Sequence, residues 1–190
     1  ENVAWTEMMV EDLMVIVAAD SEFGQRPFIR FSELCRIPLV LPGRPNVLRN
    51  VLELVCARLD MEIKVQLDCD SLPGMIELVK AGYVTVLPHF AVVDGVSAGQ
   101  LRAVPLIDPT PSWCLSVVMS RRTSNIYGSQ AVAQLMAETI RAMVESGYWR
   151  ARLNFSEPAR PCPAPPLRTK SDTRVGLSTS EKSSSINPIP

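Results

Sequence analysis

Short apolar runs alternate with stretches of helical spacing along residues 1–153, and this alternation limits the chain to a narrow set of folds. Met14 to Ala19 is a continuous apolar run, as found in a strand that is covered on both faces. Between Val47 and Leu59, apolar residues recur at the spacing of a helix with one buried face. Strands and helices in alternation predict an α/β fold with a largely parallel sheet.

Start and stop signals delimit the predicted elements. Asn46 caps the helix that runs to about Asp60, and Asp70 or Ser71 caps a second helix that ends at Gly82. The other predicted elements are a helix at 129–146 and strands at 38–41, 63–67, 83–87, 101–106 and 114–119.

Two turns that follow predicted strands carry polar groups suited to binding. In an open α/β sheet, ligands bind beyond the carboxyl ends of the strands. In the first turn, Arg44 and Arg49 offer planar cations suited to a carboxylate, phosphate or sulfate, and the helix amides after Asn46 point outward. In the second turn, residues 68–74, backbone amides and the Ser71 hydroxyl face the same crevice. This pattern favours a small anionic ligand.

A purely structural interpretation of the first turn stays open. Arg49 and Glu53 are four residues apart on one helix, a spacing at which they pair on the helix surface. Arg44 would then be solvated, and the turn would serve only to connect a strand to a helix.

The composition excludes several classes of function. The net charge is −1, whereas a surface that binds nucleic acid or anionic lipid needs clustered Lys and Arg. No apolar run is long enough to span a bilayer, and no secretory signal opens the chain. We therefore expect a cytoplasmic protein without membrane contact.

The sequence contains few residues or motifs typical of a catalytic site. The motifs GxSxG, GxGxxG and GxxxxGK[ST] do not occur, and no carboxylates pair across predicted strand ends. The one histidine, His89, is expected at the surface or at a helix cap, with a ligand-binding or acid–base role as the lesser alternative. The sequence predicts no enzyme, no cofactor and no metal site.

The five cysteines are widely spaced and contain no CxxC pair. This favours free thiols in a reducing compartment, with a disulfide or a redox site as the alternative. The cysteines are Cys35, Cys56, Cys69, Cys114 and Cys162.

Residues 154–190 are rich in proline and serine, and Phe155 is their only aromatic residue. Such a segment buries too little apolar surface to offset the entropy of ordering, so we expect it to be disordered. It is interpreted as a solvated tail or a non-native extension, with a partner-binding tail as the alternative.

Several segments, taken in order, resemble the C-terminal regulatory domain of LysR-type transcriptional regulators over about residues 5–150. In residue types and spacing, these segments are most similar to the nitrogen-assimilation-control-like branch of the family. Where this family often has a His-Pro-Leu-Ala-like stretch, the chain has Ser21-Glu-Phe-Gly24. The segments are LMVIVAAD at 13–20, PLVLPGRPNVLR at 38–49, IELVKAGYVTVLP at 76–88, GQLRAVPLIDP at 99–109 and SGYW at 146–149.

The resemblance implies two α/β subdomains like those of a type II periplasmic binding protein, with one subdomain complete and only the late part of the other present. The helix-turn-helix, the linker helix and the first half of subdomain I would precede Glu1. The implied division is 1–19 for the end of subdomain I and the first crossing strand, 20–110 for subdomain II, 111–153 for the return crossing strand and the C-terminal helix of subdomain I, and 154–190 for the tail.

The resemblance also implies a function. A small-molecule effector, here an anionic one, would bind between the subdomains and alter a DNA-binding homo-oligomer. Arg44, Asn46 and Ser71 are the candidate effector-binding residues, with Arg49 a weaker one. DNA would be bound only through the helix-turn-helix that this chain lacks. The alternative is a periplasmic solute-binding protein for transport, which has the same architecture.

Two structural expectations follow from the implied fold. Leu13–Ala19 and Cys114–Met119 should lie side by side as the two crossing strands. The absent half of subdomain I would leave Met14, Ile16 and Val117 partly uncovered, so the isolated chain should be poorly soluble or oligomeric.

Overall fold

A long strand, β1 (Val3–Ala18), connects all parts of the fold. The computed structural model describes residues 3–120 and 126–154. In this part of the chain the strand order is β2-β6-β1-β5-β3-β4, and β7 and β8 also pair with β1. The other strands are β2 (Ile29–Arg30), β3 (Leu39–Leu41), β4 (Val65–Asp68), β5 (Val84–Pro88), β6 (Leu101–Ile107), β7 (Ser112–Ser120) and β8 (Arg152–Leu153). The helices are α1 (Phe31–Leu34), α2 (Val47–Leu59), α3 (Leu72–Lys80), α4 (Val93–Ser97) and α5 (Ile126–Glu145), with 3₁₀ turns η1 (Glu22–Gln25) and η2 (His89–Val92).

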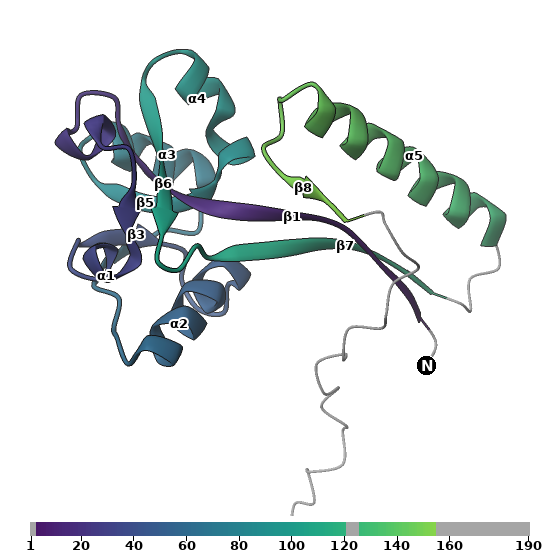
Figure 1. The fold of residues 1–190 in the computed structure, drawn as a ribbon, viewed down its shortest axis with the longest axis horizontal. Coiled ribbons are helices and arrows are strands. Elements are labelled where there is room, and N and C mark those ends of the chain that lie inside the picture. Colours follow the sequence, from purple (N-terminus) through teal and green to yellow (C-terminus); the bar gives the residue numbers. More distant parts are fainter. Residues whose placement is uncertain (1–2, 121–125, 155–190) are drawn as a thin grey trace, which may run out of the picture. The chain divides into compact units, whose positions relative to one another are not determined.

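The two halves of β1 have different partners. Residues 13–18 lie between β5 and β6, whereas residues 3–12 pair with β7. Near its middle, β1 also pairs with the short strand β8. Figure 1 shows β1 and β7 running side by side away from the region of α1 to α4. One continuous strand therefore belongs to two sheet regions.

The prediction of a largely parallel sheet is wrong. The parallel pairs in the described residues are β2–β6, β3–β4 and β3–β5, and β1 is antiparallel to all four of its partners. The reason is the direction in which β1 runs through the sheet, which is opposite to that of its neighbour β5. Leu13 lies opposite Pro88, the last residue of β5, so β1 comes in at the edge where β5 ends.

The expected pairing of the crossing strands is correct as to the strands but wrong as to the residues. Cys114 lies opposite Val10, and Met119 lies opposite Ala4, so β7 pairs with the first half of β1 rather than with Leu13–Ala19. The first half of β1 mixes polar and apolar residues, and only Met8, Met9 and Glu11 are buried there, whereas the second half is apolar and almost wholly buried. The sequence prediction treated only the apolar run as the strand, and it therefore placed β7 opposite the wrong residues of β1.

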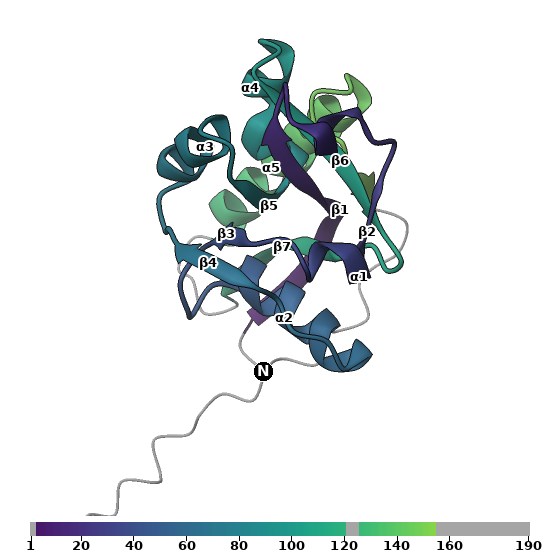
Figure 2. The same cartoon turned by 90° about the vertical axis from the view of Figure 1, so that its left-hand side faces the viewer.

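The helices begin and end where the caps predict. The Asn46 side chain accepts a hydrogen bond from Leu48 N at 2.9 Å, and the Ser71 hydroxyl accepts one from Gly74 N at 3.3 Å. Gly82 follows α3 with a φ of 100°, in the left-handed region that favours glycine. Figure 2 shows α2 and α3 on different sides of β3 and β4, as expected when successive right-handed crossovers run in opposite directions along the sheet.

β1 contains one irregularity, a bulge between Glu7 and Met9. Glu7 pairs with Ser116 and Met9 with Leu115, so Met8 is the extra residue. Met8 and Met9 are consecutive and yet both are buried, which a regular strand does not allow on a single buried face.

The expected uncovering of three apolar residues is confirmed for two of them. Met14 and Val117 are half-buried, but Ile16 is fully buried, because it lies between β5 and β6. None of the described helices is long and apolar enough to cross a membrane.

The expected tail starts one residue too early. Asn154 N donates to Met8 O at 3.1 Å, so this residue continues the pairing of β8 with β1. The prediction of disorder for the rest of the tail concerns residues 155–190, which lie outside the described residues.

Candidate functional site

The two predicted turns meet at one edge of the sheet. β3 and β4 are parallel, and Leu41 lies opposite Asp68 at their carboxyl ends. Gly43 N donates to Asp70 Oδ1 at 2.9 Å, and this contact joins the turns directly. We call residues 42–53 and 68–71 the edge site. The two turns are thus in contact, and the Gly43 amide is occupied by a carboxylate of the chain itself. That both turns face one crevice stays a prediction.

Arg49 is the buried cation of the edge site. Its side chain is 10% exposed, and its Nε donates to Glu53 Oε1 at 2.9 Å. Its Nη1 donates to Pro42 O at 3.1 Å and also to Asp68 Oδ1. The hydrogen bond to Glu53 raises the pKa of Arg49, so this side chain stays charged. The pairing of Arg49 with Glu53, which the structural interpretation of the sequence expected, is confirmed.

Arg44 is the exposed cation of the same site. Its side chain is 68% exposed, and its Nη2 donates to Glu53 Oε1 at 2.7 Å. Both arginines therefore share one carboxylate. The hydrogen bond from Arg44, together with that from Arg49, lowers the pKa of Glu53, so Glu53 is an anion at neutral pH.

Asn46 and Ser71, the other predicted site residues, serve as caps. Their side-chain oxygens accept hydrogen bonds from the first turns of α2 and α3. Each cap holds a helix N-terminus, with its partial positive charge, at the edge site. Of the two predicted arginines, Arg44 thus has the more exposed side chain, and Glu53 is its one partner among the described residues.

The charges of the edge site constrain what it can bind. The edge site holds two arginines, Arg44 and Arg49, and the three carboxylates of Glu53, Asp68 and Asp70, so the formal charges of these five side chains sum to −1. An anion must therefore compete with carboxylates of the chain, and the exposed Arg44 is where that competition is easiest. A cavity of about 370 Å³ opens beside the site and is lined by Arg44, Arg49, Glu53, Cys56 and six further residues.

A second polar cluster, centred on Glu11, was not predicted. Glu11 lies on β1 and is fully buried. Trp113 Nε1 donates to its Oε2 at 3.3 Å, and Phe90 N donates to its Oε1 at 3.4 Å. Burial raises the pKa of the Glu11 carboxyl, while the indole and backbone donors partly oppose this. The sequence did carry a signal, because Glu11 is in phase with the buried residues Leu13 and Val15 of the same strand.

His89 and Trp149 complete this cluster. The interpretation of His89 as a surface or capping residue is wrong, since it is 4% exposed and burial lowers the pKa of its imidazole. The Trp149 ring packs on Phe90 with the centroids 4.8 Å apart. The indole nitrogen of Trp149 approaches the Glu11 carboxylate without reaching hydrogen-bond geometry. The cluster therefore links β1, β7, the turn after β5 and the segment after α5.

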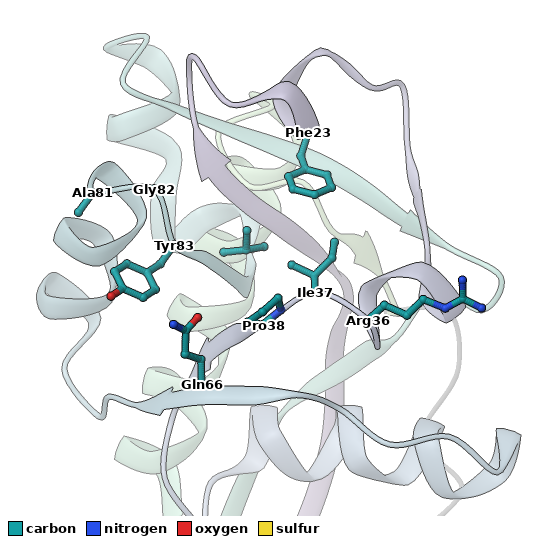
Figure 3. Close-up of a pocket in the computed structure, with 9 residues that line it drawn as sticks. Phe23, Arg36, Ile37, Pro38, Gln66, Ala81, Gly82 and Tyr83 are labelled. Carbon is teal, nitrogen blue, oxygen red and sulfur yellow. The ribbon is translucent and has the colours of Figure 1, made fainter.

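Another cavity, of about 600 Å³, lies elsewhere, at the amino ends of β3 and β5. Figure 3 shows Phe23, Ile37 and Tyr83 around it, with the Arg36 side chain directed away from Tyr83. It is shallow and lies at the opposite strand ends from the edge site, so it holds none of the predicted residues. Nowhere in the described ranges do three or more His, Cys, Asp or Glu residues form a group that could hold a metal ion.

Comparison with known proteins identifies related sequences. The family model for the LysR substrate binding domain matches residues 1–143. The HTH-type transcriptional regulator BbuR of Bordetella bronchiseptica is 25% identical over 143 residues, which make up 75% of this chain and 44% of that protein. The chain thus spans less than half the length of this curated relative.

Solved structures show the same fold. The CcmR regulatory domain of Synechocystis PCC6803, in complex with 2-PG, aligns with a TM-score of 0.62 at 14% identity, over 73% of this chain and 67% of that one. A C206 mutant of OxyR from Corynebacterium glutamicum aligns with a TM-score of 0.61 at 21% identity, over 76% of this chain and 46% of that one. The fold is α/β and of the type II periplasmic-binding-protein-like class, as the resemblance implied.

Proposed function

Because the chain belongs to the LysR substrate binding domain family, we propose that it is the effector-sensing part of a LysR-type transcriptional regulator. The curated relative BbuR is a transcriptional regulator, and the CcmR regulatory domain was solved with a small molecule, 2-PG. We assign no catalytic activity to the chain. Within the family we favour the nitrogen-assimilation-control-like branch, on the sequence segments that resemble it.

The effector in this proposal is a small anion bound at the edge site. The observation that carries it is the junction of the two turns at the carboxyl ends of β3 and β4, with two helix N-termini beside it. Arg44 is the direct contact, because its exposed guanidinium can exchange Glu53 for a ligand carboxylate or phosphate. Asn46 and Ser71 lie at the helix ends that face the ligand, and Arg49 acts from beneath by holding Glu53 and Asp68.

The response in this proposal is a change in the relative orientation of two subdomains. We divide the chain at the two crossing strands, with residues 20–110 as subdomain II and residues 1–19 and 111–153 as parts of subdomain I. The change of partners along β1, from β7 to β5 and β6, supports this division. An effector shifts the orientation only by its difference in affinity for the two states.

The parent protein in this proposal is an oligomer in the cytoplasm that binds DNA through a helix-turn-helix outside residues 1–190. The name of BbuR, an HTH-type regulator of which the chain spans 44%, supports this. We therefore expect the chain by itself to have no sequence-specific affinity for DNA.

A matched pair of arginine variants tests the proposed site. The full chain is screened by thermal shift against small carboxylates and phosphate esters, and each hit is titrated by calorimetry. Arg44→Ala should weaken binding of a hit at least about tenfold, as expected for loss of a charge-assisted hydrogen bond. Arg36→Ala removes the same charge at the opposite strand ends and should leave the affinity unchanged. Equal affinities for wild type and Arg44→Ala would remove the edge site from the proposal.

A further inference from the structure

Two cysteines that are far apart in the sequence lie in contact beside the edge site. Cys35 follows α1, Cys56 lies on α2, and their sulfur atoms are 3.7 Å apart. Cys35 is half-buried and Cys56 is buried. Two further described cysteines have other surroundings: the Cys69 thiol points to Ser71 O at 3.6 Å, and Cys114 is exposed.

We propose that Cys35 and Cys56 are a redox modification site, at which the two thiols form a reversible disulfide. The sulfur atoms need to approach from 3.7 Å to about 2.05 Å. Side-chain rotation and a small backbone shift provide such a movement, because Cys35 lies outside regular secondary structure, just after the four-residue helix α1.

The chemistry needs an oxidant of the disulfide class, such as glutathione disulfide. The Cys35 thiolate attacks one sulfur of glutathione disulfide, forms a mixed disulfide and releases one glutathione thiolate. The Cys56 sulfur then attacks the Cys35 sulfur, forms the internal disulfide and releases the second glutathione. Two protein thiols are oxidised, one glutathione disulfide is reduced to two glutathione thiols, and the two protons pass from the protein to them.

The environments of the two sulfur atoms decide the order of these steps. Cys35 is the more exposed, so an external oxidant reaches it first. Burial raises the pKa of the Cys56 thiol to about 12, so this thiol is a poor nucleophile toward a molecule from solution. Its attack on Cys35 is intramolecular, between atoms already in contact, and this proximity compensates for its low thiolate fraction.

The disulfide would act on the edge site through α2. Cys56 lies three residues after Glu53 on α2 and lines the same cavity of about 370 Å³ as Arg44 and Arg49. Drawing Cys56 toward Cys35 moves the helix that positions Glu53 between the two arginines. This consequence rests on the proposed function, whereas the disulfide itself does not.

The test is mass mapping of thiols in the full chain. The protein is incubated in a glutathione redox buffer, quenched with acid, alkylated under denaturing conditions and digested. We expect one cross-linked pair of peptides that contains Cys35 and Cys56, is two hydrogens lighter than the reduced pair, and disappears with dithiothreitol. Cys69→Ser, a matched control at a half-buried cysteine, should give the same cross-link in the same yield.

Two variants and one binding measurement complete the test. In Cys56→Ala, modification should stop at a Cys35–glutathione mixed disulfide, and in Cys35→Ser the Cys56 thiol should stay reduced. A wild-type protein that also stops at the mixed disulfide, or that joins Cys35 to Cys69 or Cys114, would overturn the proposal. Sulfate is then titrated into the oxidised and reduced proteins. A changed affinity supports the link to the edge site, and an unchanged affinity overturns that link while the disulfide stands.

Discussion

The two ends of β1 lie in regions that are packed very differently. Residues 13–18 lie between β5 and β6 under α3, and Leu13, Val15 and Ile16 are fully buried. On the other side, no α5 side chain from Tyr127 onward is fully buried. Leu135 on α5 is 64% exposed, and a cavity of about 590 Å³ lies between α5 and β7. The described core is therefore concentrated around the second half of β1.

This difference shows that continuity of a strand does not make its two ends equally stable. The first half of β1 pairs with β7 and β8, buries Met8 and Met9, and has exposed ion pairs such as Arg152–Asp12. The second half belongs to the main cluster of buried apolar residues, and such burial supplies most of the free energy of folding. Variants matched in chemistry across the two regions should therefore differ widely in stability.

The largest difference is expected between two leucine truncations. Leu13→Ala leaves a cavity in the core and should lower the free energy of unfolding by about 3 to 5 kcal/mol. Leu135→Ala makes the same chemical change at an exposed position and should cost about 0.5 kcal/mol or less. Urea denaturation followed by circular dichroism measures both. Equal losses would mean that α5 is packed against a partner under the conditions of measurement.

A smaller difference is expected between two paired arginines. Arg49→Ala removes a buried cation, leaves Asp68 without its arginine partner and leaves Glu53 paired with Arg44 alone, so it should cost about 2 kcal/mol. Arg152→Ala breaks the exposed pair with Asp12 and should cost about 0.5 kcal/mol. The same denaturation experiment at low and high salt separates them, because only the exposed pair is strongly screened. A larger loss for Arg152→Ala would contradict the comparison.

The smallest effect is expected at Glu11, where the two regions meet. Its pKa is raised in the folded state, so between its unfolded and folded pKa values the folded state binds more protons than the unfolded state. This contribution to stability is present below the unfolded pKa and is lost as the pH rises through the folded pKa. Wild type should therefore gain stability relative to Glu11→Gln as the pH falls from 7 toward 4. A difference between the two that stays constant over this range would argue against a raised pKa.

Caps and apolar periodicity were sufficient to predict α2 and α3, since Asn46 and Ser71 act locally within one helical turn. The first half of β1 was missed because two polar pairs, Thr6-Glu7 and Glu11-Asp12, interrupt it, so it has no long continuous apolar run. The burial of His89 could not be read from its neighbours, because it depends on elements distant in the sequence.

The sequence indicated where the two turns of the edge site lie, but it did not predict most of the ion pairs within the site. That the turns after β3 and β4 meet follows from parallel strands that end at one edge. The pairing of Arg49 with Glu53 has a local spacing and was weighed from the sequence. The contacts Arg44–Glu53 and Arg49–Asp68 span nine and 19 positions, and they depend on how α2 lies against β4. Such contacts require the tertiary fold.

The bulge at Met8 gives the longest strand one place where its length can vary. Removal of a residue there would restore an uninterrupted ladder between β1 and β7 and leave the partners of Met9 and all later residues unchanged. The same removal at Val15 would turn every following side chain to the opposite face. Insertions and deletions among homologues of this strand should therefore occur before Met9 rather than after it.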